Sequence, residues 1–223
     1  SLEVPRDVAA TFLLEPQSLE HELLVMTDRY TDELFALPSG LATTVTFQAS
    51  RLVVDPERFT DDALEPMAQK GMGVVYTRTS KGLPLRRAPS LDERRDLLSC
   101  FYEPHHAELT TAVAGALEAH DKCLVLDGHS FPTRALPFEY DQAPDRPDIC
   151  IGTDKSHTPN WLRDVAVHEF AQAGWSVAVD RPYAGALVPM RFYQQDARVG
   201  ALMVEVKRGL YMDEHSGAKL PCF

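Results

Sequence analysis

Apolar residues recur along the chain in two spacings, one typical of helices and one typical of short buried strands. Between 18 and 36 they recur every three or four residues, at Leu19, Leu23, Met26, Tyr30 and Leu34. Ser18 precedes them and suits an N-cap position, so the pattern predicts a helix over 18–36. Further helices are predicted near 61–69, from the capping-box sequence SLDE at 90–93, from Pro104 to about 120, and from 158 to Gly174.

Short apolar and β-branched runs predict the strands. These runs cover 43–54, 73–77, 122–127, 148–152, 175–180 and 201–207. Strands that alternate with helices predict an α/β fold with three layers, in which helices cover both faces of a mixed, mostly parallel sheet. The segment 131–147 carries four prolines and is predicted to be a long loop near a site. Because no linker interrupts the pattern, we expect residues 1–223 to form a single domain.

Composition and charge restrict the classes of partner. The net charge of −11 and the dispersed basic residues argue against a nucleic-acid partner. No apolar run approaches the roughly 20 residues that span a bilayer, and the start of the chain has no signal-peptide pattern, so no membrane partner is expected. The four cysteines form no CxxC pair. Cys123 and Cys150 lie in apolar runs and are expected to be buried thiols in a reducing, cytoplasmic setting.

His129 is the first candidate for chemistry, because a buried strand in LVLDGHSFP runs directly into it. An imidazole fixed at a strand end is a suitable zinc ligand, and Asp127 could orient it. The alternative is a polar residue that only caps the strand end, and the residue alone does not separate the two. GTDKSH at 152–157 is a similar polar cluster after a predicted strand.

Glu205 is the second candidate, because it lies among apolar residues in the strand MVEVK. A buried carboxylate without a cation is costly, and a nearby metal or arginine removes that cost. A general base beside an activated water requires such a position. The alternative is a strand with one solvated face, on which Glu205 and Lys207 are ordinary exposed residues.

Other patterns are weaker. Asp28 and Asp32 are spaced to share one face of a helix, and Arg51 and Arg58 flank a predicted strand and its turn, where they are suited to bind carboxylates. His106 follows a predicted helix start and could reach a cleft or be exposed. HEFAQ lacks the second histidine of HExxH, and no GxGxxG, Walker-type or GxSxG sequence is present, which disfavours nucleotide cofactors and serine esterases.

Eight segments together resemble the N-formylglutamate amidohydrolase family and cover most of the chain in family order. They are MTDRYTDELF (26–35), ASRLVVDPERF (49–59), GLPL (82–85), FYEPHHAEL (101–109), LDGHSFP (126–132), DICIGT (148–153), VDRPYAGALVP (179–189) and VEVKRGLYMDE (204–214). The resemblance implies a zinc-exopeptidase-like α/β fold. It also implies a cytoplasmic, zinc-dependent hydrolase of histidine catabolism that cleaves N-formylglutamate or a similar small anionic N-acyl amino acid.

The resemblance also implies roles for particular residues. His129 and Asp28 would bind the metal, Glu205 would be the general base, and Arg51 and Arg58 would bind the substrate's carboxylates. Outer candidates for substrate contacts are His106, Asp154 and Tyr183.

The sequence departs from the family pattern at three places. It begins at SLEVP, where the family has a Pro-His-Ser motif just before, so one further histidine ligand is expected upstream of Ser1. Glu57 and Asp180 stand where the family usually has asparagine, which adds negative charge and favours a different N-acyl amino acid or small amide. Two other functions stay open: a non-catalytic member that binds a small acidic ligand, and an amidohydrolase of peptides or cell-wall fragments.

Overall fold

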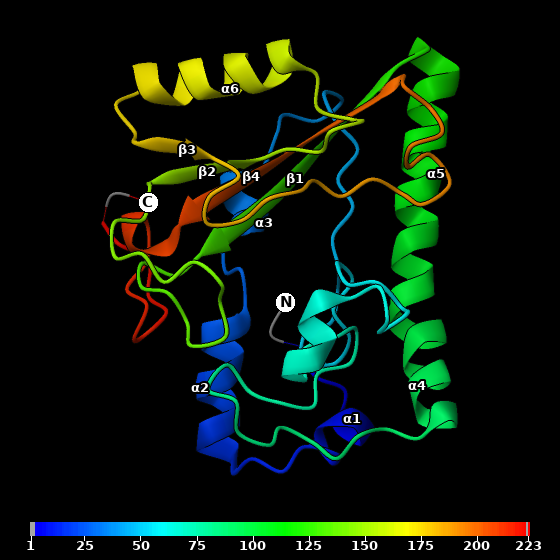
Figure 1. Ribbon diagram of the computed structural model, residues 1–223, viewed down its shortest axis with the longest axis vertical. Coiled ribbons are helices and arrows are strands. Elements are labelled where there is room, and N and C mark those ends of the chain that lie inside the picture. Colours follow the sequence, from blue (N-terminus) through cyan, green and yellow to red (C-terminus); the bar gives the residue numbers. More distant parts are fainter. Residues whose placement is uncertain (1–2, 222) are drawn as a thin grey trace. The chain divides into compact units, whose positions relative to one another are not determined.

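The structure is a computed structural model that describes residues 3–221 and 223, and these residues form two compact units (Figure 1). Unit 1 is made of the described parts of Ser1–Arg29, Thr44–Glu108 and Leu136–Glu139. Unit 2 is made of Tyr30–Thr43, Leu109–Ala135 and Tyr140–Phe223. Each unit has its own buried apolar core.

The sheet of unit 2 has four strands in the order β1-β4-β2-β3. Their bounds are Cys123–Phe131 for β1, Ile149–Gly152 for β2, Val177–Val179 for β3 and Val199–Lys207 for β4. β1 pairs with β4 and β2 pairs with β3 in parallel, whereas β2 and β4 are antiparallel. The predicted mixed, mostly parallel sheet is therefore confirmed, and the last four predicted strands all form.

Helices cover both faces of this sheet, as predicted. On one face, Val113 and Leu117 of α5 (Glu103–His120) pack with Val199 and Ala201 of β4. On the other face, Leu162 of α6 (Asn160–Gln172) belongs to a cluster with Ile149 and Ile151 of β2 and with Leu202 and Val204 of β4. Figure 1 shows α6 running along this second face, which α3 (Thr31–Leu34) also approaches near β1.

The start of one helix and the end of another follow the sequence closely. Ser90 and Glu93 form the predicted capping box at the start of α4 (Leu91–Leu97). This helix continues through a π-helical turn, η2 (Leu98–Tyr102), directly into α5. Pro104 therefore lies in the first turn of α5, as predicted, but no loop separates α5 from the preceding helix. Gly174 has a φ of 92°, a left-handed conformation that glycine adopts without strain, and it ends α6 as predicted.

Unit 1 is largely irregular and is built around a core that includes Leu52, Val53, Val54, Val74 and Tyr76. Its remaining helices are α1 (Arg6–Ala9), α2 (Pro16–Met26) and the 3₁₀ helix η1 (Pro66–Lys70). The predicted helix at 61–69 is thus reduced to η1. Among the described residues of the whole chain, no helix is both long enough and apolar enough to span a bilayer.

The predicted strands at 43–54 and 73–77 are wrong, because both segments are irregular. Val53, Val54, Val74 and Val75 are nevertheless buried in the core of unit 1, whereas residues 43–48 are exposed or half-buried. The backbone turns at Val53, whose N–H donates to the carbonyl of Ser50, and the two segments meet at one bond from Asp55 N–H to the carbonyl of Val74. Burial of these valines explains why the sequence is apolar at these positions. A strand would also require regular hydrogen bonds to a neighbouring strand, and the turn at Val53 prevents them.

The predicted helix at 18–36 is also corrected. α2 ends at Met26, and Tyr30 has a φ of 64° before the short α3 begins. Asp28 therefore lies in the link between two helices, and Asp28 and Asp32 do not share a helical face. The apolar spacing continues across the link, so spacing alone did not reveal the left-handed residue that interrupts the helix.

The expected buried thiols are confirmed for Cys150, which is fully buried on β2, whereas Cys123 at the start of β1 is half-buried. Cys222 lies outside the described residues.

Candidate active site

His129 and Glu205 are neighbours on one face of the sheet. In the parallel pairing of β1 with β4 they are register partners, and Cys150 of the antiparallel β2 is the partner of Glu205 on its other side. Paired residues of adjacent strands point to the same face, and such strands lie about 4.8 Å apart. The sequence predicts His129 at a strand end, but it lies inside β1, which continues to Phe131. The three side chains thus form a row across the face that α5 covers.

The imidazole of His129 is oriented by Asp127, as predicted. His129 Nε2 lies 2.8 Å from Asp127 Oδ1, and the other carboxylate oxygen accepts a hydrogen bond of 3.1 Å from the backbone N–H of Leu187. The two residues are two positions apart on β1, so strand alternation places them on one face. An imidazole and a carboxylate side by side are the ligand types that zinc prefers in catalytic sites, so this pair fits part of a metal site.

Glu205 is buried, with 8% of its surface exposed, so the alternative of an exposed carboxylate is wrong. Burial raises the pKa of the Cys150 thiol to about 11, and the charge of Glu205 adds to the rise. Burial also raises the pKa of the Tyr183 hydroxyl, again with Glu205 adding to the effect. The carbonyl of Tyr183 accepts a hydrogen bond of 3.2 Å from the thiol of Cys150, the register partner of Glu205.

Two buried arginines of unit 2 were missed by the sequence analysis. Arg146 donates to the carbonyl of Pro132 at 2.8 Å, and its guanidinium lies over the rings of Phe131 and Tyr183. Arg208, just after β4, donates to the hydroxyl and the carbonyl of Ser130. Both arginines partly offset the rise in the pKa of Tyr183, so their positive charges act on the same hydroxyl as the negative charge of Glu205. The position of Arg208 directly after a buried strand was the available signal.

Unit 1 holds a second charged cluster, which contains three predicted site residues. Arg51 lies 3.2 Å from the carboxylate of Asp28. Arg58 lies 3.6 Å from Asp55, which is fully buried. The turn at Ser50–Val53 and the one that follows at Asp55 bring these residues together. Both predicted carboxylate-binding arginines therefore already have acidic neighbours.

Electrostatics stabilises the charged forms in this cluster. Burial opposes the charge of Arg51, but the carboxylates of Asp55 and Asp28 raise its pKa above the usual value. Burial likewise opposes the charge of Asp55, but Arg51 and Arg58 lower its pKa, and the hydroxyl of Tyr76 donates to it at 2.5 Å. The cluster is therefore held by mutual ion pairing in the interior of unit 1.

The two other predicted contacts have local partners. In unit 1, Nε2 of His106 lies 2.8 Å from the carbonyl oxygen of Pro56, and its ring packs on Tyr102 at 4.1 Å between centroids. Burial lowers the pKa of His106, which favours the neutral ring. In unit 2, Asp154 Oδ1 accepts from the backbone N–H groups of Ser156 and His157, as in a turn after β2.

The predicted residues thus divide between the units. Unit 2 brings together His129, Glu205 and Tyr183, with Asp154 after β2, and unit 1 brings together Asp28, Arg51 and Arg58, with His106 on α5.

Known proteins resemble the chain over most of its length. The family model described as N-formylglutamate amidohydrolase matches residues 1–212. An N-formylglutamate deformylase of Pseudomonas putida is 26% identical over 195 residues, which cover 84% of this chain and 71% of that protein.

Two solved structures share the fold. An N-formylglutamate amidohydrolase of Ralstonia eutropha JMP134 has a TM-score of 0.78 at 23% identity, over 97% of this chain and 82% of that one. A gene product of Agrobacterium tumefaciens has a TM-score of 0.65 at 18% identity, over 97% and 81% of the two chains. The sequence match over nearly the whole chain shows that this protein belongs to the N-formylglutamate amidohydrolase family.

Proposed function

We propose that this chain hydrolyses the amide bond of a small N-acyl acidic amino acid of the N-formylglutamate type. The main support is the register of β1 and β4, which sets an oriented imidazole, His129, beside a buried carboxylate, Glu205. The name of the Pseudomonas putida relative supports the substrate class. The free thiols of the described chain support a reducing, cytoplasmic setting for the reaction.

A divalent metal, zinc by the chemistry of the ligands, belongs to this proposal. His129 is a proposed ligand, and its hydrogen bond to Asp127 fixes the direction of the ring. Asp28 is the second proposed ligand, because a carboxylate oxygen is one of the ligand types that zinc accepts in catalytic sites. When bound, the metal would polarise the amide carbonyl and make water acidic enough to be deprotonated near neutral pH.

Glu205 is the proposed general base. Its carboxylate takes a proton from the attacking water and returns the proton to the amine nitrogen as the carbon–nitrogen bond breaks. The products are a carboxylic acid, formate for a formyl substrate, and the free amino acid. Burial of Glu205 keeps bulk water from solvating the carboxylate, which favours its action as a base.

Arginines are proposed to bind the acidic end of the substrate. Arg51 and Arg58 are proposed for its carboxylates, and their ion pairs with Asp28 and Asp55 fix their directions. Tyr183, His106 and Asp154 are proposed as further substrate contacts. Of these three, Tyr183 has the strongest support, because its carbonyl contacts Cys150, the register partner of Glu205.

The replacement of Glu205 by glutamine tests the base. Glu205→Gln keeps the size of the side chain and removes the proton acceptor, so we expect kcat for N-formylglutamate to fall by roughly 10²- to 10⁴-fold. Release of free amino acid by the zinc-loaded protein is the measurement. Glu169→Gln, an exposed change on α6, is the matched control and should keep the wild-type rate. Full turnover by a folded Glu205→Gln variant would remove the base assignment.

The same assay separates the alternative functions. A panel of N-formyl and N-acetyl amino acids and short cell-wall-type peptides decides the substrate class, and the proposal requires the highest kcat/KM for an acidic N-acyl amino acid. Metal analysis decides whether the chain is an enzyme or a binding protein. One equivalent of zinc with hydrolysis supports the enzyme, whereas tight binding of acidic ligands without turnover supports the non-catalytic member.

A further inference from the structure

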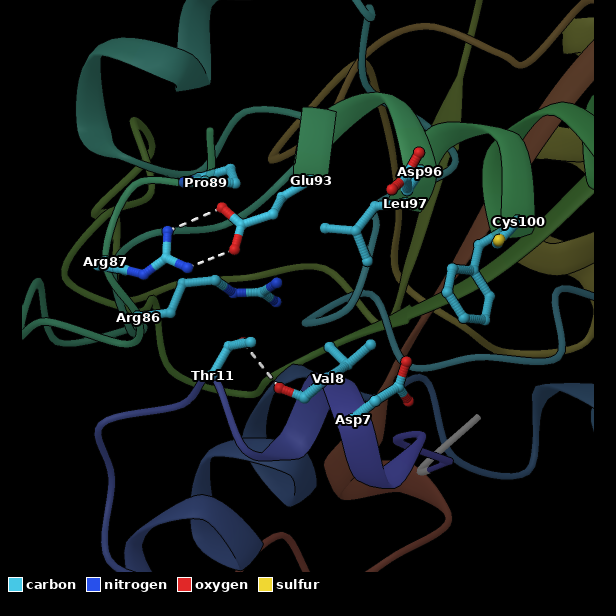
Figure 2. A pocket seen from close by; sticks show the side chains of 11 residues that line it. Asp7, Val8, Thr11, Arg86, Arg87, Pro89, Glu93, Asp96, Leu97 and Cys100 are labelled. Atoms are coloured by element: carbon cyan, nitrogen blue, oxygen red, sulfur yellow. Dashed lines mark hydrogen bonds and ion pairs between the residues drawn. The ribbon is translucent and has the colours of Figure 1, made fainter. Parts of the chain in front are cut away.

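Unit 1 contains a cavity of about 200 Å³ that shares no lining residue with the proposed active site (Figure 2). It is bounded by α1, the loop at 86–89, α4 and η2. Its lining residues are Asp7, Val8, Thr11, Arg86, Arg87, Pro89, Glu93, Asp96, Leu97, Cys100 and Phe101. The cavity is smaller than the ~300–1,000 Å³ of drug-sized sites, so it suits a small ligand.

Arg86 is the one buried charge among these residues, with 4% of its surface exposed. Its Nη2 donates to the carbonyl of Leu52 and, at 3.4 Å, to that of Val53, and its guanidinium lies 4.5 Å from the centre of the Phe12 ring. Figure 2 shows the guanidinium pointing into the cavity between Leu97 and Thr11. Burial lowers its pKa to about 10, so it stays cationic at neutral pH.

Within the part of the chain that the structure describes, no carboxylate pairs with Arg86, and its Nε has no hydrogen-bond acceptor. The half-buried Arg51 and Arg58 of unit 1 differ, because each lies beside an aspartate. A buried cation without a counter-charge is strongly destabilising, and an anion at the guanidinium removes that cost.

The acidic residues around the cavity do not supply this anion. Glu93 is engaged by Arg87 in an ion pair and by the N–H of Ser90 at the start of α4. Asp7 and Asp96 are exposed to solvent, where water screens their charges. The unmet charge inside the cavity is therefore positive, while its walls at Val8, Leu97 and Phe101 are apolar.

We propose that this cavity binds a small monocarboxylic acid with a short apolar body, whose carboxylate pairs with Arg86 and whose body contacts Val8, Leu97 and Phe101. A carboxylate matches the planar guanidinium and makes charge-assisted hydrogen bonds with it. An apolar chain of a few carbons would fill the remaining space, and its removal from water would favour binding. The site is independent of the proposed hydrolysis, because binding here requires neither the metal nor Glu205.

Cys100 is a built-in reporter of occupancy, because it is exposed and lines the cavity. The rate at which iodoacetamide alkylates Cys100 is measured by mass spectrometry of its peptide, with Cys123 of unit 2 as the internal reference. Hexanoate should slow the alkylation of Cys100 at least threefold, in a saturable manner, and leave Cys123 unchanged. 1-Hexanol has the same apolar body without the charge and should give no protection. Absent protection, or equal protection by hexanol, overturns the proposal.

Two variants locate the effect, each compared with and without hexanoate. Arg86→Leu should abolish the protection, and Arg95→Leu, an exposed arginine on α4, should keep it. If Arg86→Leu does not fold, Leu97→Trp decides, because it fills the cavity from its half-buried wall and keeps Arg86. Loss of protection in a folded Leu97→Trp protein supports the site, and protection that persists there contradicts it.

Discussion

At the residue scale, the behaviour of His129 depends on Asp127. One carboxylate oxygen of Asp127 contacts the imidazole at 2.8 Å, and the other accepts from Leu187 N–H, so the carboxylate itself is held in place. Such an arrangement determines which ring nitrogen faces a metal and in which direction it points.

The change of Asp127 to asparagine tests this dependence. Asp127→Asn keeps the shape but removes the negative charge, so we expect the affinity for zinc to fall by roughly 10- to 100-fold. Competition with a zinc-sensitive chelating dye measures that affinity. Asp164→Asn on α6 is the matched control for the loss of one exposed charge. Unchanged zinc affinity in Asp127→Asn would mean that the pair has only a structural role.

Asp55 makes the stability of the protein depend on pH. Burial disfavours its charge, but Arg51 and Arg58 outweigh burial and hold its pKa below the ordinary value. Because the pKa is lowered on folding, the stability it contributes is present above the unfolded pKa of about 4 and is lost as the pH falls through the folded pKa.

We therefore expect the free energy of unfolding to fall more steeply below about pH 4 in the wild type than in Asp55→Asn, which has no proton to bind at this position. Urea denaturation between pH 6 and pH 3 gives the two slopes. Asp61→Asn, an exposed change in the same unit, controls for net charge. Equal slopes for the wild type and Asp55→Asn would contradict the lowered pKa.

The sequence identified the central pair but missed the arginines around it. Glu205 was recognisable because a carboxylate among apolar strand residues needs a cation, and His129 because it follows an apolar run. Arg146 lies in the long loop before β2, and its burial depends on contacts with Pro132, Phe131 and Tyr183. Contacts between distant segments leave no periodic signal in the sequence, so they could not be predicted from it.

At the element scale, the accuracy of the prediction depended on whether burial and secondary structure coincide. β1, β2, β3, β4 and α6 were predicted because their apolar patterns and their turn residues agree. Residues 43–48 of one predicted strand are exposed or half-buried, whereas residues 52–54 and 74–76 are apolar and mostly β-branched but form irregular backbone in the core of unit 1. There the pattern predicted burial correctly and the backbone conformation wrongly.

Gly128 tests how closely the face of β1 opposite His129 is packed. A Cβ at this position would lie 2.6 Å from the Phe35 ring, so Gly128→Ala must displace the ring or the strand. We expect this substitution to lower the free energy of unfolding by about 1–3 kcal/mol. Gly115→Ala is the matched change on α5, where no atom lies within 4 Å, and it should stabilise by about 0.5–1 kcal/mol. Thermal or urea unfolding measures both, and a neutral Gly128→Ala would contradict the packing.

At the scale of the whole molecule, the sheet order places β4 between β1 and β2, so the candidate site extends from the edge strand β1 onto the central strand β4. The net charge of −11 repels an anionic substrate at long range, but salt screens this repulsion beyond about 8 Å. The buried Arg146, 5.8 Å from the centre of the Tyr183 ring, supplies positive charge at shorter range in unit 2. The family was predictable from eight matching segments in order along the chain. The α/β class, with helices on both faces of the sheet, was predictable from the alternation of helices and strands.

The most direct test of the account is a double-mutant cycle on His129 and Glu205. His129→Asn, Glu205→Gln and the double variant are compared with the wild type by kcat/KM for the best acidic N-acyl amino acid, all in excess zinc. Groups that act on one water lose their effect together, so we predict that the double variant loses about as much as the worse single variant. Losses that multiply, or full turnover by either single variant, would contradict the claim that this imidazole and this carboxylate serve one reaction.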